Sequence, residues 1–198
     1  MKSMPLILMI ALSPISFADT INAEDFRALA YKCASNISFD TLHAIVKTES
    51  SFNPFAIGVV NGSIKQPKTL QNALLSVQQL EKEGKNYSLG LGQINKANFS
   101  RLNLNAEQLF DPCTNLQATS KILSECYMQA KGSEGQRLEK TLSCYFSGNE
   151  VQGLKLGYVD QVKSNAQTFI PSISKLQQQS LKEDFVVSVE KTKNGLIF

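Results

Sequence analysis

The chain has 198 residues, of which 42% are hydrophobic and 19% are charged, as in an ordinary globular protein able to bury a substantial core. The formal net charge is only +3, and the basic residues are scattered. This charge pattern gives no reason to expect a nucleic-acid partner.

Residues 1–18, MKSMPLILMIALSPISFA, have the pattern of a secretory signal peptide. A lysine precedes an apolar run at residues 5–12, and the small residues Ser16 and Ala18 lie just before the expected cleavage site. An uncleaved anchor is the alternative, but this run is too short to span a bilayer comfortably, and no other segment approaches that length. We therefore expect an exported mature chain that begins at Asp19 and has no stable membrane span.

Apolar residues at helical spacing predict a first helix over residues 22–34, with Cys33 on its buried face. The second predicted helix has Asp40 as its N-cap and ends at Asn53-Pro54, because the residue before proline disfavours the helical conformation. Residues 55–68 are rich in turn formers and are expected to be a loop, with a short hairpin at VVNGSI as an option.

The rest of the mature chain continues the helical pattern. A third amphipathic helix runs from Leu70 to near Gly84, and Asn105 with Gln108 resembles the capping box of a short helix. Three further helices are marked by apolar residues within 116–130, 138–145 and 158–169, the last stopped by Pro171. We therefore predict a leader (1–18), one mainly helical domain with short β or irregular connections (19–170) and a polar tail (171–198) that is an edge strand, disordered or a docking segment.

The four cysteines, Cys33, Cys113, Cys126 and Cys144, all lie in the mature part of the chain. An even number in an exported chain predicts two disulfides and an oxidising compartment. Three pairings are open, and we favour Cys33–Cys113 with Cys126–Cys144, because the latter two fall on facing parts of consecutive predicted helices. Zinc is the alternative, but there is no CxxC motif and the chain has a single histidine. We expect no metal and no cofactor.

Glu49 is the candidate catalytic residue. Leu42, Ile45 and Val46 form one apolar stripe of the second predicted helix, and Glu49 continues that stripe. Burial of a carboxyl group favours its protonated form and raises its pKa, which a general acid near neutral pH requires. The alternative is a structural glutamate paired with a nearby lysine.

Two glycine-containing turns are candidates for binding substrate: GLGQIN at residues 90–95 and CYFSGN at residues 144–149. Glycine lets the backbone approach a ligand closely, and the amides of Gln93 and Asn95 can donate and accept hydrogen bonds, which suits a sugar. The alternatives are a β-turn without a ligand and a buried tyrosine followed by a helix C-cap. His43 lies off the apolar stripe and is expected at the surface.

Four segments in this order and spacing, TESSFNPFAIG, YSLGLGQIN, FDPCTNL and LSCYFSGN, resemble the lytic transglycosylases of the goose-lysozyme-like superfamily. The resemblance covers roughly residues 24–165 and is strongest to the small exported members that accompany type IV secretion and conjugation machines. It implies a mainly α (α+β lysozyme-like) fold, with a helical domain and a small β or loop region lining a saccharide cleft. It also implies a periplasmic location.

The resemblance implies a reaction that uses one carboxyl group, that of Glu49. Glu49 would protonate the glycosidic oxygen between N-acetylmuramic acid and N-acetylglucosamine, and then take the proton of the muramic C6 hydroxyl to give a 1,6-anhydro end. The resemblance also assigns substrate-binding or supporting roles to Ser50, Leu91, Gly92, Gln93, Tyr145, Asn149 and Tyr158. In this assignment Ser50 orients Glu49, Tyr145 supports Glu49 or the sugar, and Tyr158 closes the cleft behind Glu49. The backbone around Leu91 and Gly92 lines the glycan site, and Gln93 and Asn149 contact the glycan.

Three features depart from the common pattern of the family. Residues 58–89, with a helix of their own, intervene where many relatives have a short serine-containing loop. Phe146 stands in place of an asparagine, and Gly92 stands in place of a methionine, which would remove a side chain from the cleft.

The sequence therefore predicts a peptidoglycan lytic transglycosylase that opens the cell wall locally for a type IV secretion or conjugation machine. Its expected partners are glycan strands and components of that machine. The alternatives are a hydrolytic lysozyme of the same fold and a weakly catalytic, wall-binding assembly factor.

Overall fold

The computed structural model describes residues 20–167, so the expected leader (1–18), the tail (171–198) and the helix stop at Pro171 lie outside the described residues. Most of the described chain is helical. The helices that supply the first core are α1 (Ala23–Cys33), α2 (Phe39–Ser50), α6 (Pro112–Gln129), α7 (Glu134–Ser147) and α9 (Tyr158–Gln167). The short helix α8 (Gln152–Lys155) packs against α7 and α9. The expected helices are present, but α6 and α7 begin about four residues before the apolar positions that marked them, and the short helix α8 was not expected from the sequence.

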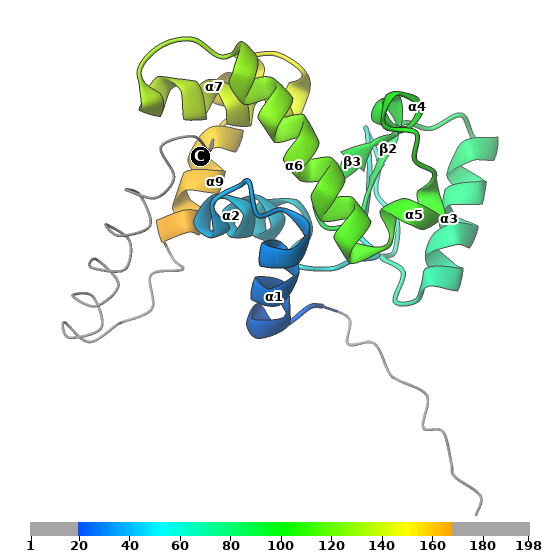
Figure 1. Cartoon of the computed structure of the whole chain (residues 1–198). Helices are drawn as coiled ribbons and strands as arrows, with labels where there is room; N and C mark the ends of the chain where they lie inside the picture. The colour runs from blue at the N-terminus through cyan, green and yellow to red at the C-terminus, as the bar shows by residue number, and fades with distance from the viewer. Residues whose placement is uncertain (1–19, 168–198) are drawn as a thin grey trace, which may run out of the picture.

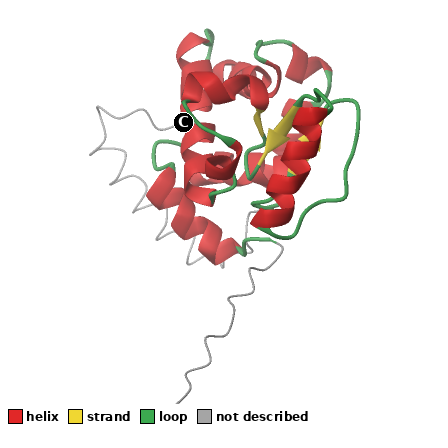
Figure 2. Ribbon diagram, turned by 90° about the vertical axis from the view of Figure 1, so that its right-hand side faces the viewer, coloured by secondary structure: helices red, strands yellow, loops and turns green. Residues whose placement is uncertain are grey.

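A small antiparallel sheet lies on the other side of the molecule, with strand order β1-β2-β3. The elements of this side are β1 (Ile57–Val59), α3 (Leu70–Lys82), β2 (Tyr87–Leu89), β3 (Ile94–Asn95), the 3-10 helix η1 (Lys96–Asn98), α4 (Phe99–Leu102) and α5 (Ala106–Leu109). Ile57 pairs with Leu89, and Ser88 pairs with Asn95. Figure 2 shows how small this sheet is beside the helices. The mainly α, α+β fold class expected from the sequence is therefore confirmed.

Helix α6 runs between the two sides and belongs to both (Figure 1). Asp111 caps its N-terminus by accepting a hydrogen bond from the Thr114 amide (2.8 Å), and Pro112 occupies the first turn, where a missing N–H costs nothing. Leu116 and Leu123 join the core cluster of α1, α2 and α9. On the opposite face of α6, residues such as Ile122 join the second cluster, which packs under the sheet and α3.

Both disulfides end on α6. Cys33–Cys113 joins the end of α1 to the start of α6, and Cys126–Cys144 joins the C-terminal half of α6 to α7. These are the two pairs favoured from the sequence. Because each bridge crosses between two packed helices, α6 is fixed at both ends relative to its neighbours.

Two local expectations for α2 are wrong. Its N-cap is Ser38, whose hydroxyl accepts a hydrogen bond from the Thr41 amide, rather than Asp40. The helix also ends at Ser50, before Asn53-Pro54, because Ser51 and then Phe52 adopt left-handed backbone conformations (φ 50° and 65°). Two successive left-handed residues turn the chain back, and the Phe52 side chain packs against the first core cluster.

His43 is buried rather than at the surface. Its ring lies among those of Phe26, Phe39 and Phe52, with centroids 4.9–5.9 Å away. The expectation failed because α1 and the chain after α2 cover a second side of the helix, which the single apolar stripe did not reveal. Burial lowers the pKa of His43.

The optional hairpin at VVNGSI is present only in part. Val59 ends β1, where it pairs with Tyr87 of β2, and a single isolated bridge joins Val59 to Gly62. The capping box at Asn105 and Gln108 is confirmed, with both reciprocal hydrogen bonds at 3.0 Å. Within residues 20–167, no helix is both long enough and apolar enough to cross a membrane.

Candidate active site

A pocket of about 580 Å³ opens beside the C-terminal end of α2, between the β2–β3 hairpin and the end of α7. Side-chain amides and hydroxyls supply much of its lining: Asn86, Ser88, Gln93, Asn95, Asn98 and Ser147. Glu49 is the only carboxylate among the described residues that line it. The pocket can therefore offer many hydrogen bonds to an uncharged polar ligand, together with one ionisable group.

Glu49 lies in the last turn of α2 and lines the pocket. The neighbouring residues Leu42, Ile45 and Val46 are fully buried and seat this helix in the core. Burial raises the pKa of Glu49 from its usual value near 4.5 to about 7, although a hydrogen bond from Tyr158 acts in the opposite direction. Near neutral pH the side chain is therefore balanced between the acid and the carboxylate.

Tyr158 begins α9, which packs against α2. Its hydroxyl donates a hydrogen bond of 2.5 Å to Oε1 of Glu49. Burial, and next the nearby Glu49 carboxylate, raise the pKa of Tyr158 well above its usual value, so the phenol stays protonated and remains a donor. A second link between the two helices comes from the Asn165 side-chain amide, which donates to the Thr48 hydroxyl (2.9 Å).

The β2–β3 turn is anchored on α6 by Asn115, which is fully buried. The Asn115 amide nitrogen donates to the carbonyls of Leu89 and Leu109, and its oxygen accepts from the backbone N–H of Gly92 (2.8 Å). The Asn115 side chain thus makes three of the four hydrogen bonds that an amide group can make, and these three fix the turn to the helix. The pocket wall is thereby held in place by α6.

Gly92 is required by close packing. A Cβ atom at this position would lie 2.0 Å from the Thr119 hydroxyl and 2.8 Å from the Tyr145 hydroxyl. A side chain at residue 92 would thus collide with α6 and Tyr145. The glycine permits a tight contact between the turn and these helices, which differs from the expectation that it clears a side chain from the cleft.

Gln93 lines the pocket in a left-handed backbone conformation (φ 51°). Its side-chain amide nitrogen donates to the carbonyls of Gly90 (2.9 Å) and Ala56 (3.1 Å). These bonds tie the hairpin turn to the chain just before β1. The Gln93 side chain therefore builds the pocket wall, and its expected contact with substrate remains a prediction.

Tyr145 reaches the same turn from α7. Its hydroxyl donates to the Gly92 carbonyl (2.5 Å), and burial raises its pKa. Tyr145 lines the pocket together with Glu49. This contact connects α7 with the β2–β3 turn, and so joins the two walls of the pocket.

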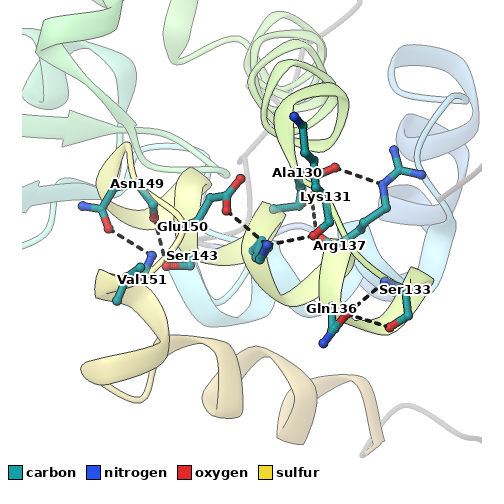
Figure 3. A network of polar contacts seen from close by, with 11 residues as sticks. Ala130, Lys131, Ser133, Gln136, Arg137, Ser143, Asn149, Glu150 and Val151 are labelled. Atoms are coloured by element: carbon teal, nitrogen blue, oxygen red, sulfur yellow. Dashed lines mark hydrogen bonds and ion pairs between the residues drawn. The ribbon is translucent and has the colours of Figure 1, made fainter.

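The structure brings Glu49, Gln93, Tyr145 and Tyr158 together. Ser50, Leu91 and Asn149 are not among the residues that line the pocket, and their expected roles remain predictions. The Ser50 hydroxyl donates to the Val46 carbonyl of its own helix (3.2 Å). Leu91 is fully buried in the first core cluster. Asn149 does not line the pocket, and its side-chain oxygen accepts a hydrogen bond from the backbone amide of Val151 (Figure 3). The same oxygen accepts from the backbone amide of Gln152 at the start of α8.

The sequence reasoning missed part of the polar lining, namely Asn86, Ser88 and Asn98. One signal was available for Ser88: it lies between Tyr87 and Leu89, which are both buried, and alternation predicts that a residue between two buried ones faces the other side of a strand. Among the described residues, no group of three or more His, Cys, Asp and Glu side chains lies close enough to hold a metal ion.

Comparison with known proteins identifies the family of the chain. The sequence profile of the family described as "Transglycosylase SLT domain" matches residues 27–167. The chain is similar to the "Type IV secretion system protein virB1" of Brucella suis biovar 1, with 42% identity over 151 residues that cover 71% of this chain and 63% of that protein. It is also similar to "Protein virB1" of Agrobacterium tumefaciens, with 30% identity over 183 residues that cover 91% of this chain and 77% of that protein.

The aligned part of the chain thus spans less than two thirds of the length of the Brucella relatives. No solved structure matches the chain.

Proposed function

The chain belongs to the Transglycosylase SLT domain family, and from this premise we propose that it is a lytic transglycosylase that cleaves the glycan strands of peptidoglycan. The single observation that carries the proposal is Glu49, the only carboxylate among the described residues that line the pocket, with its pKa raised to about 7. Glycosidases commonly need two carboxyl groups, one as the acid and one as the base or nucleophile. A pocket with a single carboxyl group among its described lining residues favours a mechanism in which the substrate supplies its own nucleophile.

In the first step, protonated Glu49 donates its proton to the oxygen that joins C1 of N-acetylmuramic acid to N-acetylglucosamine. The C1–oxygen bond breaks, the leaving sugar departs with a hydroxyl group, and positive charge develops at C1. The hydrogen bond from Tyr158 to Oε1 supports this step, since it stabilises the carboxylate that Glu49 becomes.

In the second step, the Glu49 carboxylate removes the proton of the muramic C6 hydroxyl. The oxygen of that hydroxyl attacks C1 and closes a 1,6-anhydro ring, so no water is consumed and Glu49 is protonated again. One side chain thus acts first as the acid and then as the base, which is consistent with a pKa near neutrality.

The products of digestion test this proposal against hydrolysis. Mature protein is incubated with purified peptidoglycan, and the soluble muropeptides are analysed by mass spectrometry. We expect 1,6-anhydromuramoyl ends, which are lighter than reducing ends by one water molecule. Reducing ends would show instead that the protein is a hydrolytic lysozyme of the same fold.

The pH dependence follows from the protonation state that the first step needs. Because the raised pKa of Glu49 is about 7, the active acid form is lost as the pH rises through that value. We expect kcat/KM to fall tenfold per pH unit above about pH 7. The Tyr158 hydrogen bond lowers the pKa of Glu49, so Tyr158→Phe should move this alkaline limb to higher pH while it reduces kcat.

A pH–rate profile of the wild type and of Tyr158→Phe on soluble glycan strands measures the alkaline limb of each protein. An alkaline limb of Tyr158→Phe that coincides with that of the wild type would contradict the assigned contact. Tyr87→Phe is a matched control, since the Tyr87 hydroxyl also donates to a carboxylate, that of Glu81, but neither residue lines the pocket. We expect its pH profile to match that of the wild type.

The wider role is proposed from the relatives. Since one relative is named as a type IV secretion system protein, we propose that this protein opens the cell wall locally, in the periplasm, for a secretion or conjugation machine. The glycan strands are its substrate, and components of that machine are its partners. The expected signal peptide and the two disulfides are consistent with export.

A further inference from the structure

Phe146 is a large apolar side chain that remains exposed at the pocket. It lies in the last turn of α7, lines the pocket together with Glu49, and is 44% exposed. Several single apolar side chains are exposed on the surface, but among the described residues Phe146 is the exposed aromatic one that lines the pocket together with Glu49, and a ligand that covered its remaining surface would gain apolar burial.

One face of the ring is already covered. The Phe146 ring stacks on the ring of Tyr158, with centroids 4.6 Å apart and an angle of 22° between the planes. Tyr158 in turn is buried and donates its hydroxyl to Glu49. The stack therefore fixes the orientation of Phe146 relative to the catalytic carboxyl group, while 44% of the residue stays exposed where it lines the pocket.

We propose that Phe146 is a sugar-stacking residue that binds one pyranose ring of the glycan next to Glu49. This inference rests on the proposed function and names a specificity-determining contact for it. A pyranose presents hydroxyl groups at its edge and C–H groups on its faces. The flat ring of Phe146 matches a C–H face, and the surrounding side chains match the edge.

The neighbours of Phe146 support a sugar over a purely apolar ligand. Ser147, Asn95 and Asn98 line the same pocket and carry the donors and acceptors that ring hydroxyls and acetamido groups need. Ligand sites commonly combine an aromatic surface with a few placed polar groups in this way. Phe146 is thus a binding residue whose rigid support, Tyr158, also contacts the catalytic acid.

Binding without turnover gives the first test. In the Glu49→Gln background, β-1,4-linked N-acetylglucosamine tetramer is titrated into the protein and followed by calorimetry. We expect Phe146→Leu, which keeps an apolar cover over Tyr158 but removes the flat ring, to weaken binding about tenfold, a typical aromatic contribution of about 1.4 kcal/mol. Phe146→Trp, which keeps a flat ring, should bind within about threefold of the parent.

Tyr31→Leu is the matched control. Tyr31 is also an exposed aromatic residue (62%) that stacks on a second ring, that of Phe39, but it lies on α1 and does not line the pocket. We expect this variant to bind the tetramer as the parent does. Equal weakening by Tyr31→Leu and Phe146→Leu would overturn the inference, because the loss would then not depend on the pocket.

Kinetics on soluble glycan strands separate binding from a structural effect. With Glu49 intact, Phe146→Leu should raise KM about tenfold and leave both kcat and the alkaline limb near their wild-type values. A lower kcat with a shifted limb and an unchanged KM would overturn the inference, because Phe146 would then act only through Tyr158 and Glu49. Tetramer binding that is unaffected by Phe146→Leu overturns this inference alone, whereas absence of binding and of cleavage in the parent proteins overturns the proposed function as well.

Discussion

Glu49→Gln is expected to lower the rate of peptidoglycan cleavage by about 10²–10⁴-fold, the usual contribution of a general acid or base. The amide keeps the shape of the side chain but can neither give its proton to the glycosidic oxygen nor accept one from the C6 hydroxyl. No other described residue lining the pocket carries a carboxyl group that could replace it. Release of soluble muropeptides from purified peptidoglycan measures the loss.

The same variant should be more stable than the wild type at neutral and alkaline pH. The pKa of Glu49 is about 7 in the folded protein and near 4.5 when the chain is unfolded. The unfolded chain therefore loses its proton first, and the folded state loses stability as the pH rises from about 4.5 to 7. Above about pH 7, this pKa shift lowers the free energy of unfolding of the wild type by at most about 3 kcal/mol, and glutamine, which does not ionise, avoids that loss.

Denaturant unfolding at pH 4 and at pH 8 measures this difference. We expect nearly equal stabilities at pH 4 and a more stable Glu49→Gln protein at pH 8. An inactive variant that is also less stable at pH 8 would show that its loss of activity reflects misfolding. If a stable Glu49→Gln variant instead left both peptidoglycan cleavage and assembly of the machine unchanged, that result would favour a wall-binding assembly factor over an enzyme.

Removal of the Cys33–Cys113 disulfide should produce the largest loss of stability. The bridge spans 80 residues, and the chain-entropy relation gives a stabilisation of about 4.5 kcal/mol for a loop of that length. Domains of this size are commonly stable by only about 5–15 kcal/mol. The double variant Cys33→Ala with Cys113→Ala should therefore unfold at a much lower denaturant concentration.

The Cys126–Cys144 bridge provides the comparison. It spans 18 residues, for which the same relation gives about 3 kcal/mol. Paired alanine variants of the two bridges, unfolded in urea without reductant, should therefore rank in this order. An equal or reversed order would show that strain or residual structure in the unfolded chain outweighs loop length. An unchanged midpoint on reduction of the wild type would contradict the presence of both bridges in solution.

Helix positions could be predicted because local signals agree with the final packing. The stripe of Leu42, Ile45 and Val46 predicted that Glu49 lies on the buried side of α2, and the structure places those three residues in the core. Asn105 and Gln108 specify a capping box through contacts three residues apart. Such features depend on neighbours in the sequence, which a single chain displays directly.

The pocket could be predicted only in outline, because its walls meet through distant parts of the chain. Tyr158 contacts Glu49, which lies 109 residues earlier in the chain. Asn115 binds the backbone of Gly92, which lies 23 residues earlier. The resemblance to a family suggested Tyr158, whereas Asn115, which lies in the FDPCTNL segment, was assigned no role. The prediction that His43 lies at the surface was wrong for the same reason, since the rings that bury it come from α1 and from the chain after α2.

The shared helix α6 also determines how the molecule can unfold. It supplies buried side chains to both core clusters, so loss of either cluster exposes one face of the helix. A helix of this length draws most of its stability from tertiary packing, and it would not persist on the remaining face alone. The two sides should therefore melt in one cooperative transition, and the pocket, whose walls come from both, exists only while that whole unit is intact.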